Sequence, residues 1–144
     1  MSEAKPWMHF FVGSPRYAGL LKIVKDEARS VGWGVADFSV PGNAYTWLDI
    51  DEPDAFVSYL TPKKRGSGED PARQQPVLDL IVRAHELEIP VALLTPRSLG
   101  SVDRFLDPNR DIVIPATLDL TAEALSRSPL SDWLGQTASL PLAA

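Results

Sequence analysis

Basic residues gather in this chain where short apolar segments end. Arg16 follows the first segment and Arg97 follows the fourth, and three cations follow the third: Lys63, Lys64 and Arg65. Arginine presents a fork of donors that matches phosphate oxygens. These positions predict a site for an anion, such as the phosphate of a nucleotide. A solvated basic loop is the competing interpretation.

The turn after the first apolar segment could form part of the same site. Gly13 would let the backbone approach a ligand closely, and Ser14 could bond to phosphate or sugar oxygens. A helix that starts near Arg16 would add free N–H groups and a partial positive charge. The turn has neither a G-x-G-x-x-G motif nor a Walker lysine, so an ordinary strand-to-helix turn competes with this hypothesis. Thr61, at the end of the third segment, could bond to the ligand or cap its own turn.

Aromatic and acidic residues supply further candidates. Trp47 could stack on a base, as could Tyr45, because this segment lacks an evident packing role, whereas we expect Trp33 and Trp133 to lie in the core. Asp79 is the candidate catalytic acid, since the helix that carries it could begin at the ligand edge. Its alternative role is that of a first-turn acid favoured by the helix dipole.

The remaining chemistry-bearing residue types are scarce. The chain has two histidines, His9 and His85, whose positions do not predict convergence on one site. It has no cysteine, which excludes disulfides, thiolate catalysis and cysteine-ligated metals. We therefore expect neither a metal site nor a cofactor.

The elements that must position these residues are marked by proline. Proline cannot donate to a sheet, so each proline after an apolar run predicts the carboxyl end of a strand. Five such runs occur: 9–12, 33–38, 55–60, 91–94 and 111–114. Helical patterns lie between them, which predicts a three-layer α/β sandwich with about five parallel strands, of the flavodoxin or Rossmann-like type. Ligands of such sheets bind at the carboxyl ends of the strands.

The helices follow from apolar spacing and from helix-ending residues. Apolar residues three and four apart predict a first helix over 17–31 that stops at Gly32. Residues 42–48 predict a short helix or turn, and 49–54 an acidic approach to the third strand. We expect one long loop over 62–75, a helix that opens at Pro76, and a last helix from Thr121 followed by a turn at 130–134.

Composition sets the outer limits. The 144 residues fit one domain, which we place at residues 1–134, with a disordered tail at 135–144. The net charge of −5 argues against general nucleic-acid binding. We expect no membrane span and no signal peptide, and hence a cytoplasmic protein.

One resemblance is carried by three segments. Residues 10–15 resemble the opening strand and turn of the nucleoside 2-deoxyribosyltransferase group and of TIR-like domains, residues 54–62 resemble their middle strand, and residues 80–91 their following helix and strand. The resemblance implies nucleotide binding and N-glycosidic bond cleavage or transfer by a glutamate in that helix. The matching position is Leu80, with Asp79 beside it.

A second resemblance is to receiver-like domains of the flavodoxin type, including the wing domain of bacterial ornithine, lysine and arginine decarboxylases. Residues 78–96, especially 89–95, resemble their fourth helix-strand unit. A working receiver needs acids after strand one, a phospho-accepting aspartate after strand three and a lysine after strand five. The corresponding places here hold Gly13-Ser14, Thr61-Pro62 and Pro115-Ala116.

Two functions therefore remain open. The first is binding of a nucleotide or nucleotide-derived anion at the strand ends, with N-glycosidic chemistry if the protein is an enzyme. The second is a non-catalytic pseudo-receiver that binds a protein partner or forms a homodimer through an exposed apolar patch, with Trp47 or the last helix as its candidate places.

Overall fold

A five-stranded, wholly parallel sheet forms the centre of the protein. The computed structural model describes residues 6–12, 18–59, 71–95, 106, 110–115, 122–126 and 129–138. The strand order is β2-β1-β3-β4-β5. The strands are β1 (Trp7–Phe11), β2 (Gly34–Phe38), β3 (Ala55–Tyr59), β4 (Val91–Thr95) and β5 (Ile112–Pro115). This order is that of a flavodoxin-like doubly wound fold, so the predicted fold class is confirmed.

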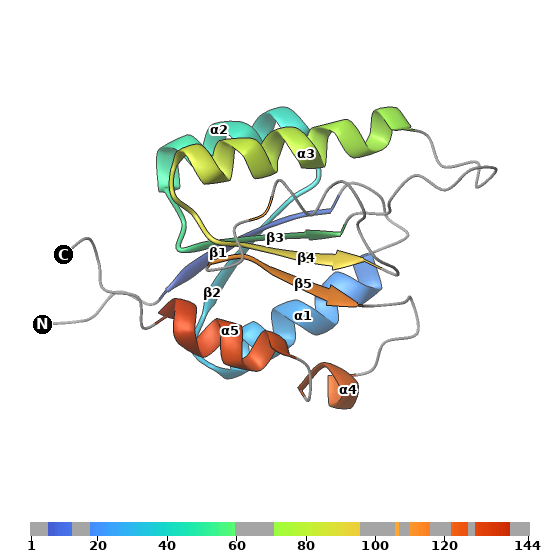
Figure 1. Ribbon diagram of the computed structural model, residues 1–144, viewed down its shortest axis with the longest axis vertical. Helices are drawn as coiled ribbons and strands as arrows, with labels where there is room; N and C mark the ends of the chain where they lie inside the picture. Colours follow the sequence, from blue (N-terminus) through green and yellow to red (C-terminus); the bar gives the residue numbers. More distant parts are fainter. Residues whose placement is uncertain are drawn as a thin grey trace, which may run out of the picture.

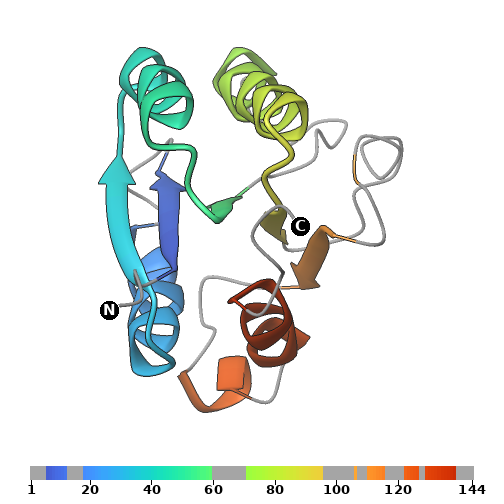
Figure 2. The same cartoon turned by 90° about the vertical axis from the view of Figure 1, so that its left-hand side faces the viewer.

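Helices cover both faces of this sheet. Helix α2 (Pro41–Asp51) and helix α3 (Pro71–Glu86) lie on one face. Helices α1 (Ala18–Ser30), α4 (Ala122–Ser126) and α5 (Pro129–Ala138) lie on the other. The view along the sheet shows the three layers, with α2 above the β2 edge and α3 beside it (Figures 1 and 2). In the described part of the chain, no helix has the length and apolar content needed to cross a membrane.

Alternating side chains of the central strands build a separate core on each face. Met8 and Phe10 of β1 point toward α1 and α5, where Trp33 and Trp133 are also buried. Phe11 points to the opposite face, where Leu48 of α2 and Leu80 of α3 pack against the sheet. All five residues of β3 and of β4 are buried, as expected for inner parallel strands. The core positions predicted for Trp33 and Trp133 are therefore confirmed.

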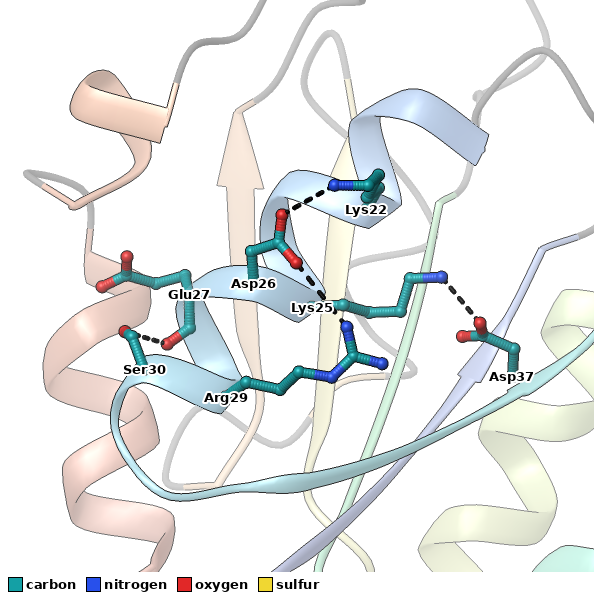
Figure 3. Close-up of polar contacts among 7 residues, drawn as sticks. All are labelled: Lys22, Lys25, Asp26, Glu27, Arg29, Ser30 and Asp37. Carbon is teal, nitrogen blue, oxygen red and sulfur yellow. Dashed lines mark hydrogen bonds and ion pairs between the residues drawn. The ribbon is translucent and has the colours of Figure 1, made fainter.

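Helix α1 presents a charged face to solvent (Figure 3). Lys22 Nζ donates to Asp26 over 3.0 Å, and Asp26 also pairs with Arg29 at 3.6 Å. Lys25 reaches out of the helix to Asp37 of β2, at 2.7 Å. The helix ends as predicted, with Gly32 at a φ of 98°.

The structure corrects three predicted boundaries. The segment after Pro41 is a full helix that continues to Asp51, so Asp49 and Asp51 belong to α2 and not to a lead-in. Helix α3 begins at Pro71, which places Pro76 inside it and shortens the predicted loop. Pro76 falls in the second turn, where the carbonyl of residue 72 loses its intrahelical donor. Helix α5 continues to Ala138, beyond the point at which the tail was expected to start.

Candidate functional site

The carboxyl edge of the sheet carries the predicted anion site. Every strand pair is parallel, so all five strands end on this edge. Eight predicted ligand residues belong to connections after these strands and lie outside the described residues: Gly13, Ser14, Arg16, Thr61, Lys63, Lys64, Arg65 and Arg97. The anion site therefore stays a prediction.

The described polar residues nearest this edge serve the sheet itself. Ser58 Oγ of β3 donates to the carbonyl of Phe11 over 2.9 Å, in the buried interior. Thr95, which ends β4, is buried, and Tyr59 is packed in the core on the α1 side. These three side chains act as packing and hydrogen-bonding groups of the fold, so Tyr59 offers no free ring for stacking on a ligand.

The candidate acid Asp79 lies on the solvent side of α3. Its neighbour Leu80 is buried in the core between α3 and the sheet. Adjacent residues differ by about 100° around a helix, so the position that faces the sheet holds leucine and the carboxylate faces away. Asp79 as a catalytic acid remains a prediction to which this geometry adds no support.

Trp47 lies on the exposed surface of α2. It is 43% exposed, and Val40 and Ile50 are exposed by 52% and 61%. Trp47 stands six residues beyond the first residue of α2, about 9 Å along the helix axis from the start of the helix. Trp47 is therefore not a core residue, in agreement with the sequence analysis. Its position within α2 is, however, beyond the turn that follows β2.

The side of α2 that faces α3 is held by polar contacts. Arg83 of α3 donates to Asp49 over 2.6 Å, and its guanidinium lies 5.8 Å from the ring centre of Tyr45. These contacts tie the two helices together. Tyr45 is therefore engaged with α3.

The two histidines each pair with a different aspartate near the amino edge. His9 Nε2 is 2.9 Å from Asp51 of α2. His85 Nε2 is 2.6 Å from Asp111, whose other oxygen accepts the Val91 N–H of β4 at 2.9 Å. Within the described part of the chain, no group of three or more histidine or carboxylate side chains could hold a metal ion.

Burial dominates the electrostatics of His9. Its side chain is 1% exposed, and its Nδ1 is buried with no hydrogen-bond partner among the described residues. Desolvation lowers the pKa of His9 below 6.5, while the hydrogen bond and charge of Asp51 act in the opposite direction. Neither aspartate could be recognised from the sequence as a partner of a histidine, because the paired residues are 42 and 26 positions apart.

Several solved structures with a similar fold are receiver domains. A response regulator receiver protein from Sinorhizobium medicae is 16% identical, with a TM-score of 0.56, over 90% of this chain and 95% of that chain. The signal receiver domain of a modulated diguanylate cyclase from Desulfovibrio desulfuricans is 14% identical, with a TM-score of 0.56, over 93% and 97%. No family model and no curated protein matches the chain.

A third neighbour adds a detail of chemistry. The receiver domain of a sensor histidine kinase from Pseudomonas aeruginosa is 16% identical, with a TM-score of 0.53, over 92% of this chain and 99% of that chain. That domain holds a magnesium ion coordinated in its active site cleft. The chain described here has a receiver-like, flavodoxin-type fold. The neighbours support the receiver-like expectation and give no support to the deoxyribosyltransferase or TIR-like one.

Proposed function

We propose that this protein is a non-catalytic receiver-like domain that acts by binding a protein partner. The observation that carries the proposal is a receiver-type sheet whose strand ends lack the residues of phosphoryl transfer. Gly13-Ser14 follows β1, Thr61-Pro62 follows β3, and Pro115-Ala116 stands at the end of β5.

The residues needed for phosphoryl transfer are absent from whole segments of the sequence and not only from single positions. The sequence has no aspartate or glutamate between Asp54 and Glu69, so no carboxylate near the end of β3 can accept a phosphoryl group. It has no lysine after Lys64, so none can follow β5 and neutralise the phosphoryl charge. A hydroxyl and a proline at the end of β3 cannot replace a carboxylate, which acts both as nucleophile and as metal ligand.

The surface of α2 supports the binding half of the proposal. Trp47 and Ile50 are large apolar side chains on a helix that packs on the sheet through Ala44 and Leu48. Contiguous exposed apolar surface marks interaction sites in proteins of this size. Interaction sites are also enriched in tryptophan.

Incubation with acetyl phosphate and Mg²⁺, followed by intact mass spectrometry, tests the loss of phosphoryl chemistry. We expect no phosphoryl adduct under conditions that label a receiver with a complete acidic site. The expected cause is the absence of a nucleophile at the end of β3. A covalent adduct on this chain would contradict the proposal.

A nucleotide panel tests the competing function at the strand ends. A ligand at 100 times its dissociation constant adds about 2.7 kcal/mol to folding stability, which moves the unfolding midpoint by several degrees. The proposal predicts no shift with NAD, ATP, cyclic nucleotides or deoxynucleoside monophosphates. A shift with one of them, lost on replacing Arg16 and Arg97 with alanine, would favour anion binding instead.

A further inference from the structure

Helix α2 carries an apolar stripe on the side that does not face α3. The stripe consists of Trp47 and Ile50, which are three residues apart on one side of the helix, and of Val40, the extended N-cap residue that precedes the helix. All three are exposed. Tyr45 and Asp49, which engage Arg83 of α3, lie on the other flank. The stripe therefore has no cover from the helix next to α2.

The region around this stripe is acidic. From Ser30 to Pro62 the chain has no lysine, arginine or histidine and five carboxylates: Asp37, Asp49, Asp51, Glu52 and Asp54. Lys25 pairs with Asp37, Arg83 pairs with Asp49, and His9 pairs with Asp51. Asp51, Glu52 and Asp54 lie at the carboxyl end of α2 or just beyond it, where the helix dipole adds negative potential.

The acidic end of α2 also presents an aromatic residue. The backbone N–H of Trp7 donates to Asp54 over 2.8 Å, and Trp7 is itself 39% exposed. Glu52 follows the helix in a left-handed conformation, with φ at 44°, and is exposed. An apolar stripe thus leads into a cluster of carboxylates.

We propose that the α2 stripe and its acidic end bind a basic amphipathic helix of a partner protein. This inference rests on the proposed function and names the chemistry of the partner. The spacing of three residues between Trp47 and Ile50 suits packing against another helix. Lysine or arginine on the flanks of that helix would face Glu52 and Asp54, and its apolar side would cover Trp47 and Ile50.

Charge argues against a second copy of this chain as the occupant. A symmetric dimer through α2 would pair two copies of a segment that carries five carboxylates and no lysine, arginine or histidine from Ser30 to Pro62. Such a contact offers these carboxylates no cation of the same segment, whereas a basic partner gains from each of them. The acidic surface would also speed its approach at low salt.

A designed peptide provides the direct test. The peptide has about 18 residues, enough to hold a helix, with leucine at heptad a and d positions and lysine elsewhere. We expect it to bind the full chain, measured by fluorescence anisotropy, and to shift the amide resonances of α2. A peptide with the same leucines and glutamate in place of lysine should not bind. Failure of the lysine peptide to bind would overturn the inference.

Variants of the apolar stripe locate the binding. The double variant Trp47→Ala, Ile50→Ala should weaken peptide affinity at least about tenfold, because buried tryptophan dominates interface energetics. Val82→Ala is the matched control, since Val82 is 47% exposed on the neighbouring α3. Both changes remove exposed side chains, and an unchanged unfolding midpoint verifies folding. Equal affinity of the double variant and the wild type would contradict the assignment.

Charge reversal distinguishes specific binding at the acidic end of α2 from attraction by the net charge of the protein. Glu52 and Glu88 both follow a helix on the same face of the sheet, and both have positive φ, at 44° and 60°. Glu52→Lys should weaken the lysine peptide several-fold more than Glu88→Lys does. Equal effects of the two reversals would show attraction by net charge alone and would overturn the specific site.

The same variants distinguish this inference from the proposed function. A natural partner captured by the wild-type chain should be lost by the Trp47→Ala, Ile50→Ala variant. If the variant keeps that partner, the α2 site is wrong while partner binding stands. If the chain forms a phosphoryl adduct, the proposed function fails irrespective of the peptide result.

Discussion

Individual residues near the amino edge of the sheet join elements that are distant in sequence. The side chain of Asp111, just before β5, is 1% exposed and accepts the Val91 N–H while pairing with the ring of His85, so it connects β5, β4 and α3. Asp51 binds His9 and connects α2 to β1. A buried carboxylate is tolerated because its oxygens accept hydrogen bonds. These polar groups are explained by the stability of the fold rather than by catalysis.

Protonation of His9 should weaken the fold at acidic pH. Burial lowers the pKa of His9 in the folded chain below 6.5, its value in the unfolded chain. At a pH between the folded and the unfolded pKa, the unfolded chain therefore binds more protons than the folded chain. Stability from this residue is fully present above pH 6.5 and is lost as the pH falls below it. Urea denaturation of the wild type and of His9→Gln, across this range, measures the effect. The variant should show the weaker pH dependence, and identical slopes would contradict this account.

Buried and exposed carboxylates should differ sharply in energetic importance. Asp111→Ala leaves the buried Val91 N–H without its partner and should reduce the free energy of unfolding by about 2–3 kcal/mol. Asp26→Ala removes two exposed ion pairs on α1 (Figure 3) and should cost no more than about 1 kcal/mol. Chemical denaturation of both variants measures the difference. Equal losses would refute the role assigned to Asp111.

Among the elements, the β2 edge depends on one close contact. Trp7 and Gly34 are direct partners in the β1–β2 pair. A Cβ at Gly34 would clash with the Trp7 ring, so glycine makes room for this ring across the edge strand. Both the amino end of the sheet edge and the acidic end of α2 thus involve Trp7.

Substitution at Gly34 should reveal this contact. Gly34→Ala forces the Trp7 ring to move and should destabilise the fold by about 1–3 kcal/mol. The same change in a Trp7→Ala background should cost at least about 0.5 kcal/mol less, since the clash is gone. Thermal unfolding of the four proteins completes the double-mutant cycle. Additive effects would show that the contact is not coupled.

The strands were predictable because proline marks their ends in the sequence. All five were placed to within two residues of their observed bounds. Helix α2 was harder to predict, because apolar residues occur on both its buried and its exposed sides and blur the helical period. The exposed apolar residues of α2 are also the ones on which the proposed partner site rests. The start of α3 was predicted too late, because Pro76 was assigned to the first turn of the helix. The structure places Pro76 in the second turn of a helix that begins at Pro71.

The site was less predictable than the fold. The positions of the basic residues predicted an anion site at the carboxyl edge of the sheet, and these residues lie outside the described part of the chain. The sequence also singled out Trp47, but it did not show that this residue lies on the exposed side of a helix. The partners of the two histidines could not be predicted from the sequence, because it is the folded arrangement of strands and helices that places Asp51 next to His9 and Asp111 next to His85. The absence of the receiver's phosphoryl-transfer residues, by contrast, could be read from the residue types that follow β1, β3 and β5 in the sequence.

At the scale of the whole molecule, stability should be graded from the centre of the sheet to its β2 edge. Strands β3 and β4 are buried throughout and paired on both sides, whereas β2 is an edge strand with partly exposed residues. Native-state hydrogen exchange should therefore be slowest for amides of β1, β3 and β4 and faster for β2. Equal protection of β2 and β4 would contradict this gradient.

Photo-crosslinking in the cells that make this protein tests the central claim most directly. A photoreactive phenylalanine analogue replaces Trp47 of α2 in one variant and Val82 of α3 in the other, two positions of similar exposure. We expect a discrete adduct with one partner protein from position 47 and none from position 82. No adduct from position 47, or an adduct only at position 82, would contradict it.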